Sequence, residues 1–193
     1  MQANCTRGTL SKTCGKKANI NNNFAQQNVP AEAETARLSL NSTLAFETKY
    51  KDIKKMNITE IPFNKFIEIL SDDRDKSHLN LEFKDHMKNH LGTVHASAQF
   101  SLGEACSGLC LQRTFPQLEN SVVPILRKCE VKFKRPANSN IRAQAEIIEE
   151  NVKRFEHQLE RKGRASIEVA VDVLDQDGTI TMSGSYEWFA QKI

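Results

Sequence analysis

Apolar and polar residues alternate in four segments of the second half of the chain, as is typical of strands with one buried face. These segments are residues 128–134, 141–147, 165–173 and 180–188. Between the second and third segments, Val152, Phe155 and Leu159 recur at helical spacing, and Gly163 is placed to cap that helix. The sequence DQDG at 175–178 predicts the turn between the last two strands.

Two shorter elements are predicted upstream. Pro62 is followed by FNKFIEIL, which suggests a short helix with one apolar side. The residues on that side are Phe63, Phe66, Ile67 and Leu70. The segment HLNLEF at 78–83 alternates and predicts a strand.

A long helix is predicted between these two groups of elements, from about Val94 to Thr114, with Pro116 just beyond its end. It is apolar almost all round, as expected of a helix enclosed by other structure. The economical arrangement is an α+β fold in which an antiparallel sheet wraps around this central apolar helix. Such a sheet leaves edges and one exposed face, so we expect a homodimer or homotetramer.

Residues 1–55 differ from the rest, since they are rich in Asn, Gln, Thr, Ser and Ala and show no convincing apolar period. This composition predicts a disordered or weakly ordered N-terminal tail before a domain at 56–193. Two alternatives remain open. The basic, acid-poor beginning also resembles an organellar transit peptide, and Met56 would begin the domain if the first start codon lies upstream of the true one.

Composition narrows the possible functions. No apolar run approaches the roughly 18 residues of a membrane span, and a net charge of +3 is too small to indicate nucleic-acid binding. Cys106 and Cys110 are four residues apart among apolar neighbours, without the His or Cys pattern of a metal site. We therefore expect no metal and no cofactor, buried free thiols, and a cytoplasmic protein, or an organellar one if the first residues are a transit peptide.

Glu104 is the one formally charged side chain between Asn89 and Gln112. A carboxylate in a buried helix costs several kcal/mol unless it is paired or protonated. Glu104 is therefore either a structural acceptor, for example for Ser107 or the backbone, or part of a site.

The start of the same helix offers further chemistry. The first-turn N–H groups around His95, Ala96 and Ser97 lack intrahelical acceptors and could hold an oxyanion or a carbonyl oxygen. Glu104 would then act as a general base or nucleophile, and Asn89 could orient water or the substrate carbonyl.

The spacing of these residues resembles the signature of hotdog-fold acyl-CoA thioesterases, in the branch that includes the phenylacetyl-CoA thioesterases. That signature is an Asn, five residues, His-Gly-Gly, six residues and an acidic residue followed by small ones. Here Asn89, His95 and Glu104 stand at the matching positions. The similarity extends loosely over 58–193, including KFKRPA at 132–137 and the last strand with Trp188, and is closest to a poorly characterised subgroup.

The resemblance implies hydrolysis of an acyl-CoA or acyl-carrier thioester at a dimer interface. Glu104 of one subunit would activate water or attack the thioester, opposite the helix start of the other subunit. The N–H near Ser97 would polarise the carbonyl, Asn89 would position water, and His95 would shape the helix start. The candidate substrate-binding residues are Gly92, Ala96, Lys134 and Arg135.

Two departures from the signature leave alternatives open. Ala96 and Ser97 replace the glycine pair, which favours a non-catalytic acyl-binding or interaction module. Glu replaces the commoner Asp. His90 precedes Glu104 by the interval found in hotdog hydroxyacyl thioester dehydratases, a third possible function. Lys134 and Arg135 fit either coenzyme A phosphates or a solvated strand face.

Overall fold

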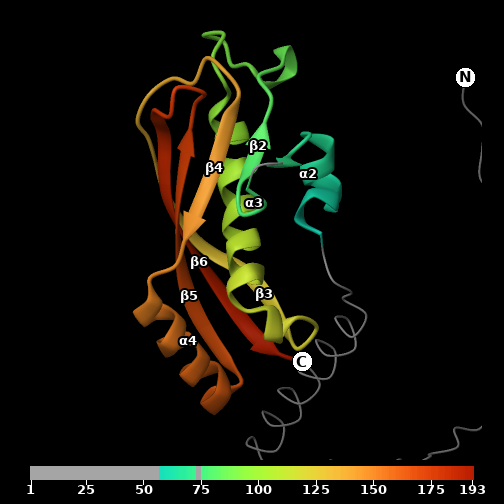
Figure 1. Ribbon diagram of the computed structural model, residues 1–193, viewed down its shortest axis with the longest axis vertical. Coiled ribbons are helices and arrows are strands. Elements are labelled where there is room, and N and C mark those ends of the chain that lie inside the picture. Colours follow the sequence, from blue (N-terminus) through green and yellow to red (C-terminus); the bar gives the residue numbers. More distant parts are fainter. Residues whose placement is uncertain (1–56, 73–74) are drawn as a thin grey trace, which may run out of the picture. The chain divides into compact units, whose positions relative to one another are not determined.

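The computed structural model of the protein describes residues 57–72 and 75–193 (Figure 1). The predicted tail at 1–55 lies outside the described residues. The helical elements in chain order are η1 (Ile58–Glu60), α2 (Pro62–Phe66), η2 (Asp85–Met87), α3 (Ala96–Thr114), η3 (Pro116–Leu118) and α4 (Glu149–Lys162). The strands are β1 (Leu70–Ser71), β2 (Leu79–Leu81), β3 (Val122–Phe133), β4 (Ile141–Glu146), β5 (Arg164–Leu174) and β6 (Ile180–Lys192).

The six strands form one antiparallel sheet in the order β1-β2-β4-β5-β6-β3. Because α3 lies between β2 and β3 in sequence, the chain passes from one side of the sheet to the opposite edge through this helix. The two edges are the two-residue strand β1 and the twelve-residue strand β3. A long edge strand with unpaired N–H and C=O groups is a surface on which another strand can pair.

Helix α3 lies along one face of this sheet, mainly over β4 and β5 (Figure 1). Its apolar residues pack with the inward-facing residues of the strands, and Leu102, Cys106 and Tyr186 are fully buried in this core. A second cluster joins Phe115 at the end of α3 to Phe155 of α4. The predicted α+β arrangement of an antiparallel sheet around a central apolar helix is confirmed.

The first predicted helix is wrong in length and in its buried side. Helix α2 ends at Phe66, and Glu68 has a positive φ of 60° that turns the chain into β1. Since the helical period stops there, Ile69 becomes the buried residue, and Leu70 lies on the sheet edge. Phe63 and Phe66 are exposed, and the buried side of α2 is polar, with Asn64 Nδ2 donating to the Ile58 carbonyl at 2.9 Å.

The four predicted strands are confirmed, and β3 and β6 extend by several residues beyond the alternating segments. Strand β3 already begins at Val122, and its register against β6 shifts between Leu126 and Lys128. This bulge breaks the two-residue period, which explains why the alternation is visible only after it. Strand β6 continues to Lys192. Gly163 caps α4 with a left-handed φ of 67°, as predicted.

Candidate functional site

Glu104 lies in the middle of α3 and is half-buried. Its carboxylate makes no hydrogen bond and no ion pair with any residue that the structure describes. Burial removes water from this group and raises the pKa of the Glu104 carboxyl above its ordinary value of 4.5. A carboxyl group that is partly desolvated and has no structural partner is a candidate for proton transfer or nucleophilic attack.

The helix face that contains Glu104 is turned toward β6. Residues one turn before and one turn after lie on the same side of a helix, and both contact this strand. The Tyr186 hydroxyl donates to the Phe100 carbonyl at 3.4 Å, and Trp188 Nε1 donates to Ser107 Oγ at 3.0 Å. Glu104 therefore lies on the β6 side of α3, and β6 pairs with the edge strand β3.

Ser107 does not satisfy the Glu104 carboxylate. Its hydroxyl donates instead to the main-chain carbonyl of Glu104, at 2.7 Å. The structural alternative considered from the sequence, in which Ser107 binds the side chain, is thus not the arrangement in the fold.

The start of α3 is shaped by His95, which is the N-cap. His95 Nδ1 accepts a hydrogen bond from the Ser97 N–H at 3.1 Å, and its carbonyl accepts from the N–H groups of Ala98 and Gln99. The Ala96 N–H has no partner among the described residues. Ala96 and Ser97 are both exposed. The free donor of this turn is therefore the Ala96 N–H, while the Ser97 N–H becomes available only if the His95 ring moves.

Asn89 holds the loop before the helix in place. Its Oδ1 accepts from the N–H groups of Leu91 and Thr93, at 2.9 and 3.2 Å, and its Nδ2 donates to Thr93 Oγ1 at 2.8 Å. Gly92 has a φ of 76°, a conformation that favours glycine, and is exposed at the loop tip. His90 is exposed in the same loop. Most of the Asn89 amide is thus committed to the loop, with one N–H left over.

Lys134 and Arg135 follow the end of β3, and their N–H groups both donate to the Thr181 carbonyl. Two residues further on, the Ala137 carbonyl accepts from the Val94 N–H at 2.8 Å. This hydrogen bond fixes the loop after β3 against the chain that enters α3. Both basic side chains are exposed, and neither forms an ion pair with a described residue. The fold therefore brings the loop that bears these charges beside the helix start.

Within one chain, however, the helix start and Glu104 do not meet. Eight residues separate Ala96 from Glu104, which is about 12 Å along the axis at the rise of an α-helix. One subunit supplies a group of residues around the helix start and, separately, the carboxylate. A single thioester carbonyl cannot contact both from the same chain.

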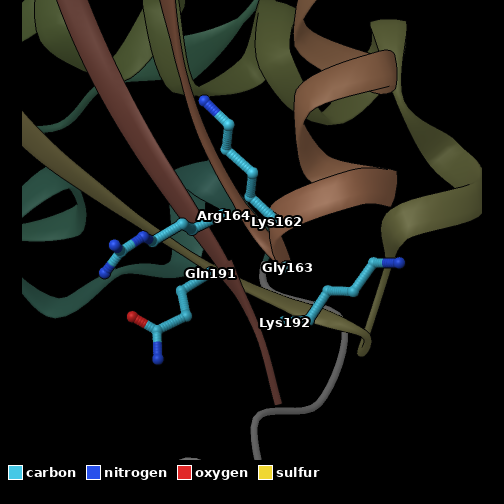
Figure 2. Close-up of a pocket in the computed structure, with 5 residues that line it drawn as sticks. All are labelled: Lys162, Gly163, Arg164, Gln191 and Lys192. Carbon is cyan, nitrogen blue, oxygen red and sulfur yellow. The ribbon is translucent and has the colours of Figure 1, made fainter.

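Neither the cysteines nor a hollow beyond the end of α4 extends this site. Burial raises the pKa of the Cys106 thiol to about 12, and the pKa of Cys110 is raised for the same reason. No group of three metal-ligating side chains is found within residues 57–72 and 75–193. A hollow beyond the end of α4 is lined by Lys162, Arg164 and Lys192, whose side chains point in different directions (Figure 2).

Comparison with models of protein families shows the family to which the chain belongs. Residues 53–190 match the family described as "Domain of unknown function (DUF4442)". The chain belongs to this family. No curated protein matches the DUF4442 chain.

Solved structures relate the fold of the DUF4442 chain to thioesterases. A probable thioesterase of unknown function from Pseudomonas aeruginosa is 19% identical, with a TM-score of 0.58, over 70% of this chain and 91% of that one. A protein of unknown function from Chlorobaculum tepidum is 17% identical, with a TM-score of 0.61, over 77% of this chain and 95% of that one. A Bacillus halodurans protein crystallised with CoA is 17% identical, with a TM-score of 0.52, over 84% of this chain and 92% of that one. At such identities the similarity shows the fold, which is the hotdog fold of the thioesterase-like family.

The comparisons do not test two of the sequence-based predictions. The branch of the superfamily is not specified, so the relationship to phenylacetyl-CoA thioesterases stays a prediction, as do the roles of the site residues.

None of the helices in the described part of the chain combines the length and the apolar character that a membrane span requires.

Sequence reasoning missed Tyr186 and Trp188 as partners of the helix that contains Glu104. Both residues fall within the alternating segment 180–188, but Ser107 and Trp188 are 81 positions apart in the chain. Periodicity assigns a residue to a face and does not say which helix residue it meets. The one available signal was that a buried Trp needs an acceptor for its N–H.

Proposed function

We propose that the protein hydrolyses the thioester of an acyl-CoA. The observation that supports this most directly is the half-buried Glu104 carboxylate, which has no partner among the described residues and a raised pKa. The fold is shared with a probable thioesterase and with a protein crystallised with CoA. A carboxylate whose pKa is raised by burial is a stronger base than an exposed one, and it is suited to accept a proton from water or to attack a carbonyl carbon.

In the proposed reaction the ionised Glu104 takes a proton from water, and the water oxygen attacks the thioester carbonyl carbon. The carbon–sulfur bond then breaks, and the protonated Glu104 gives its proton to the leaving coenzyme A sulfur, which restores the carboxylate. The negative charge on the carbonyl oxygen is stabilised by the helix-start N–H of Ala96, and also by that of Ser97 once the His95 ring has moved away from it. Asn89, with its remaining N–H, positions the water or the carbonyl. Direct attack by Glu104 gives the same products through an acyl-enzyme anhydride.

We propose that two copies of the chain form each site. The separation of about 12 Å along α3 supports this proposal, because one thioester carbonyl cannot contact the helix start and the carboxylate of the same chain. The edge strand β3 pairs with β6, Glu104 lies on the β6 side of α3, and no other described strand pairs with the free edge of β3. Pairing of two such edges would bring the helix start of one subunit toward Glu104 of the other.

Lys134 and Arg135 are proposed to bind the phosphates of coenzyme A. Both are exposed and unpaired among the described residues, and the Val94–Ala137 hydrogen bond places their loop beside the helix start. A guanidinium and an ammonium group are suitable partners for phosphate oxygens.

We also propose that the protein is cytoplasmic. Free thiols at Cys106, Cys110 and Cys129 fit the reducing environment of that compartment.

Assay of a panel of acyl-CoA thioesters, with the released thiol as the readout, tests this function. Glu104→Ala is expected to lower kcat by at least about 100-fold, since general-base catalysis typically contributes 10²–10⁴-fold. Glu160→Ala is the matched control, because Glu160 is an exposed glutamate of α4. It should keep the full rate.

The same experiment distinguishes the alternatives. A wild-type protein that binds acyl-CoA without turnover would be a non-catalytic binding module, which the exposed Ala96 and Ser97 side chains favour. Hydration of an enoyl thioester that depends on His90 would indicate a dehydratase. Full hydrolytic activity of Glu104→Ala would exclude the mechanism proposed here.

A further inference from the structure

Two residues of the fold form a link between β6 and the turn of α3 that contains Glu104. Trp188 Nε1 donates to Ser107 Oγ at 3.0 Å, and Ser107 Oγ donates to the Glu104 carbonyl at 2.7 Å. Ser107 is fully buried. Because a hydroxyl has one proton, the bond to Glu104 leaves the oxygen free to accept from the indole. The two bonds together form a continuous chain from strand to helix.

A second contact lies one turn earlier on the same helix. The Tyr186 hydroxyl donates to the Phe100 carbonyl at 3.4 Å, and the two rings lie 5.9 Å apart. Tyr186 and Trp188 lie two residues apart on β6, so they point to the same face of the sheet. The turn with Glu104 is thus held to β6 on both sides.

The carboxylate itself has no such anchor, since it makes no bond to a described residue. Its position therefore depends on where the helix backbone places it. Side-chain ends lie about 5–6 Å from a helix axis, so a rotation of roughly 10° would move the carboxylate by about 1 Å. A displacement of about 1 Å at reacting groups can cost about 100-fold in rate.

We propose that Ser107 and Trp188 are positioning residues, which fix the turn of α3 so that Glu104 points at the reacting thioester. This inference rests on the proposed function and adds two residues that do not touch the substrate. The indole and the hydroxyl act on Glu104 through its main chain.

The test compares Ser107→Ala, Trp188→Phe and their combination with a control on the same helix. Ser101 is that control, because Ser101 Oγ makes a bond of the same kind, to the Ser97 carbonyl at 2.8 Å, and no residue of the described strands bonds to it. Ser107→Ala and Trp188→Phe should each lower kcat about tenfold or more and leave KM within about twofold. The double variant should lose little more than the worse single variant, since both changes break one link. Ser101→Ala should match the wild type.

A second readout does not depend on turnover. The titration of the Glu104 carboxyl can be followed by carbon-13 NMR, with thermal melting to confirm that each variant is folded. The titratable side chains near this helix face are Tyr186, Cys106 and Cys129. Loosening the turn admits water, so the pKa of Glu104 should fall toward its ordinary value in Ser107→Ala and Trp188→Phe. It should not change in Ser101→Ala.

These two readouts separate the inference from the function on which it rests. If Glu104→Ala is inactive while both Ser107→Ala and Trp188→Phe keep kcat and the Glu104 pKa, the positioning role is wrong and the thioesterase function stands. A loss of kcat that Ser101→Ala reproduces would also overturn it. If the wild type hydrolyses no thioester, the proposed function fails. Independently of turnover, an unchanged Glu104 pKa in folded Ser107→Ala and Trp188→Phe would show that these residues do not position Glu104.

Discussion

At the scale of single residues, burial determines the direction in which the pKa of Glu104 is shifted. The pKa of its carboxyl is raised by desolvation alone, without an adjacent like charge as a further cause. Water exclusion is also what strengthens electrostatic interactions at a reacting centre. The same partly buried environment therefore explains both why ionising this carboxyl group costs free energy and why the carboxylate is suited to act as a base.

The pH dependence of hydrolysis follows from this shift. Glu104 must be ionised to accept a proton, so kcat/KM should rise with pH and level off above the pKa of the free enzyme. Because burial raises that pKa, the midpoint should lie above the ordinary value of 4.5. The measurement is a profile of kcat/KM from acid to neutral pH, with Glu104→Gln as the control that removes the ionisation. A midpoint at or below 4.5 would contradict the assignment.

The sequence was sufficient to single out Glu104 but not its surroundings. One charge in a long apolar segment is visible in the chain itself. The resemblance implied that His95 shapes the helix start, and in the structure its Nδ1 accepts from the Ser97 N–H at 3.1 Å. The commitment of the Asn89 amide to its own loop depends on backbone geometry around Gly92. Such local folding is decided by turn conformation, which the spacing of residues does not specify.

At the scale of elements, the approach of α3 to β6 depends on a glycine. A Cβ on Gly103 would lie 2.6 Å from the Tyr186 hydroxyl and 2.9 Å from Met182 Cε. Tyr186 is fully buried and its hydroxyl donates to the Phe100 carbonyl, so a shift of its ring would disturb that bond and the core around it. Gly108 lies on the same helix, but a Cβ there would be 3.5 Å from Trp188, an ordinary contact.

These two glycines provide a matched prediction. Gly103→Ala should destabilise the fold by about 1–2 kcal/mol, since overpacking costs about 1–3 kcal/mol and offsets the helix propensity of alanine. Gly108→Ala should be neutral or stabilise by up to about 1 kcal/mol. Urea denaturation of the two variants measures both free energies of unfolding. Equal effects at both positions would show that the helix does not approach β6 as closely as described.

The elements predicted best are those whose burial is uniform along their length. Helix α3 was predicted from Val94 to Thr114 and runs from Ala96 to Thr114, because almost every side of it is covered. Helix α2 failed because one turn and a half of helix cannot impose its period on Ile69 and Leu70 once Glu68 turns the chain. The pattern of apolar residues in the sequence did not indicate that Phe63 and Phe66 would be exposed.

At the scale of the whole molecule, the edge strand β3 has an apolar face that α3 does not cover. Cys129, Val131 and Phe133 pair in register with Tyr186, Gly184 and Met182, so they lie on the helix side of the sheet. The alternation predicted from the sequence is therefore present, yet Cys129 is exposed and Phe133 is 45% exposed. An uncovered apolar edge next to the site is where a second subunit would pack.

Protection of Cys129 from alkylation tests the proposed dimer. In the wild type at high concentration, Cys129 should react slowly with a maleimide, as read by peptide mass spectrometry, because the partner subunit covers β3. Phe133→Glu places a charge on that face and should give a monomer by sedimentation, with rapid labelling of Cys129 and loss of thioester hydrolysis. Phe66→Glu is the matched control, since Phe66 is 80% exposed on α2, and it should change none of these.

The outcome bears directly on how the site is built. If Glu104 and the helix start come from different subunits, activity and dimer content should fall together across a series of protein concentrations, because dilution separates both at once. A Phe133→Glu monomer with full hydrolytic rate would place the oxyanion donors and Glu104 in one chain. Such a site could not use the Ala96 N–H, which lies about 12 Å along the helix from the carboxylate. Sedimentation and the thiol-release assay on the same samples therefore decide whether the helix start takes part in the reaction.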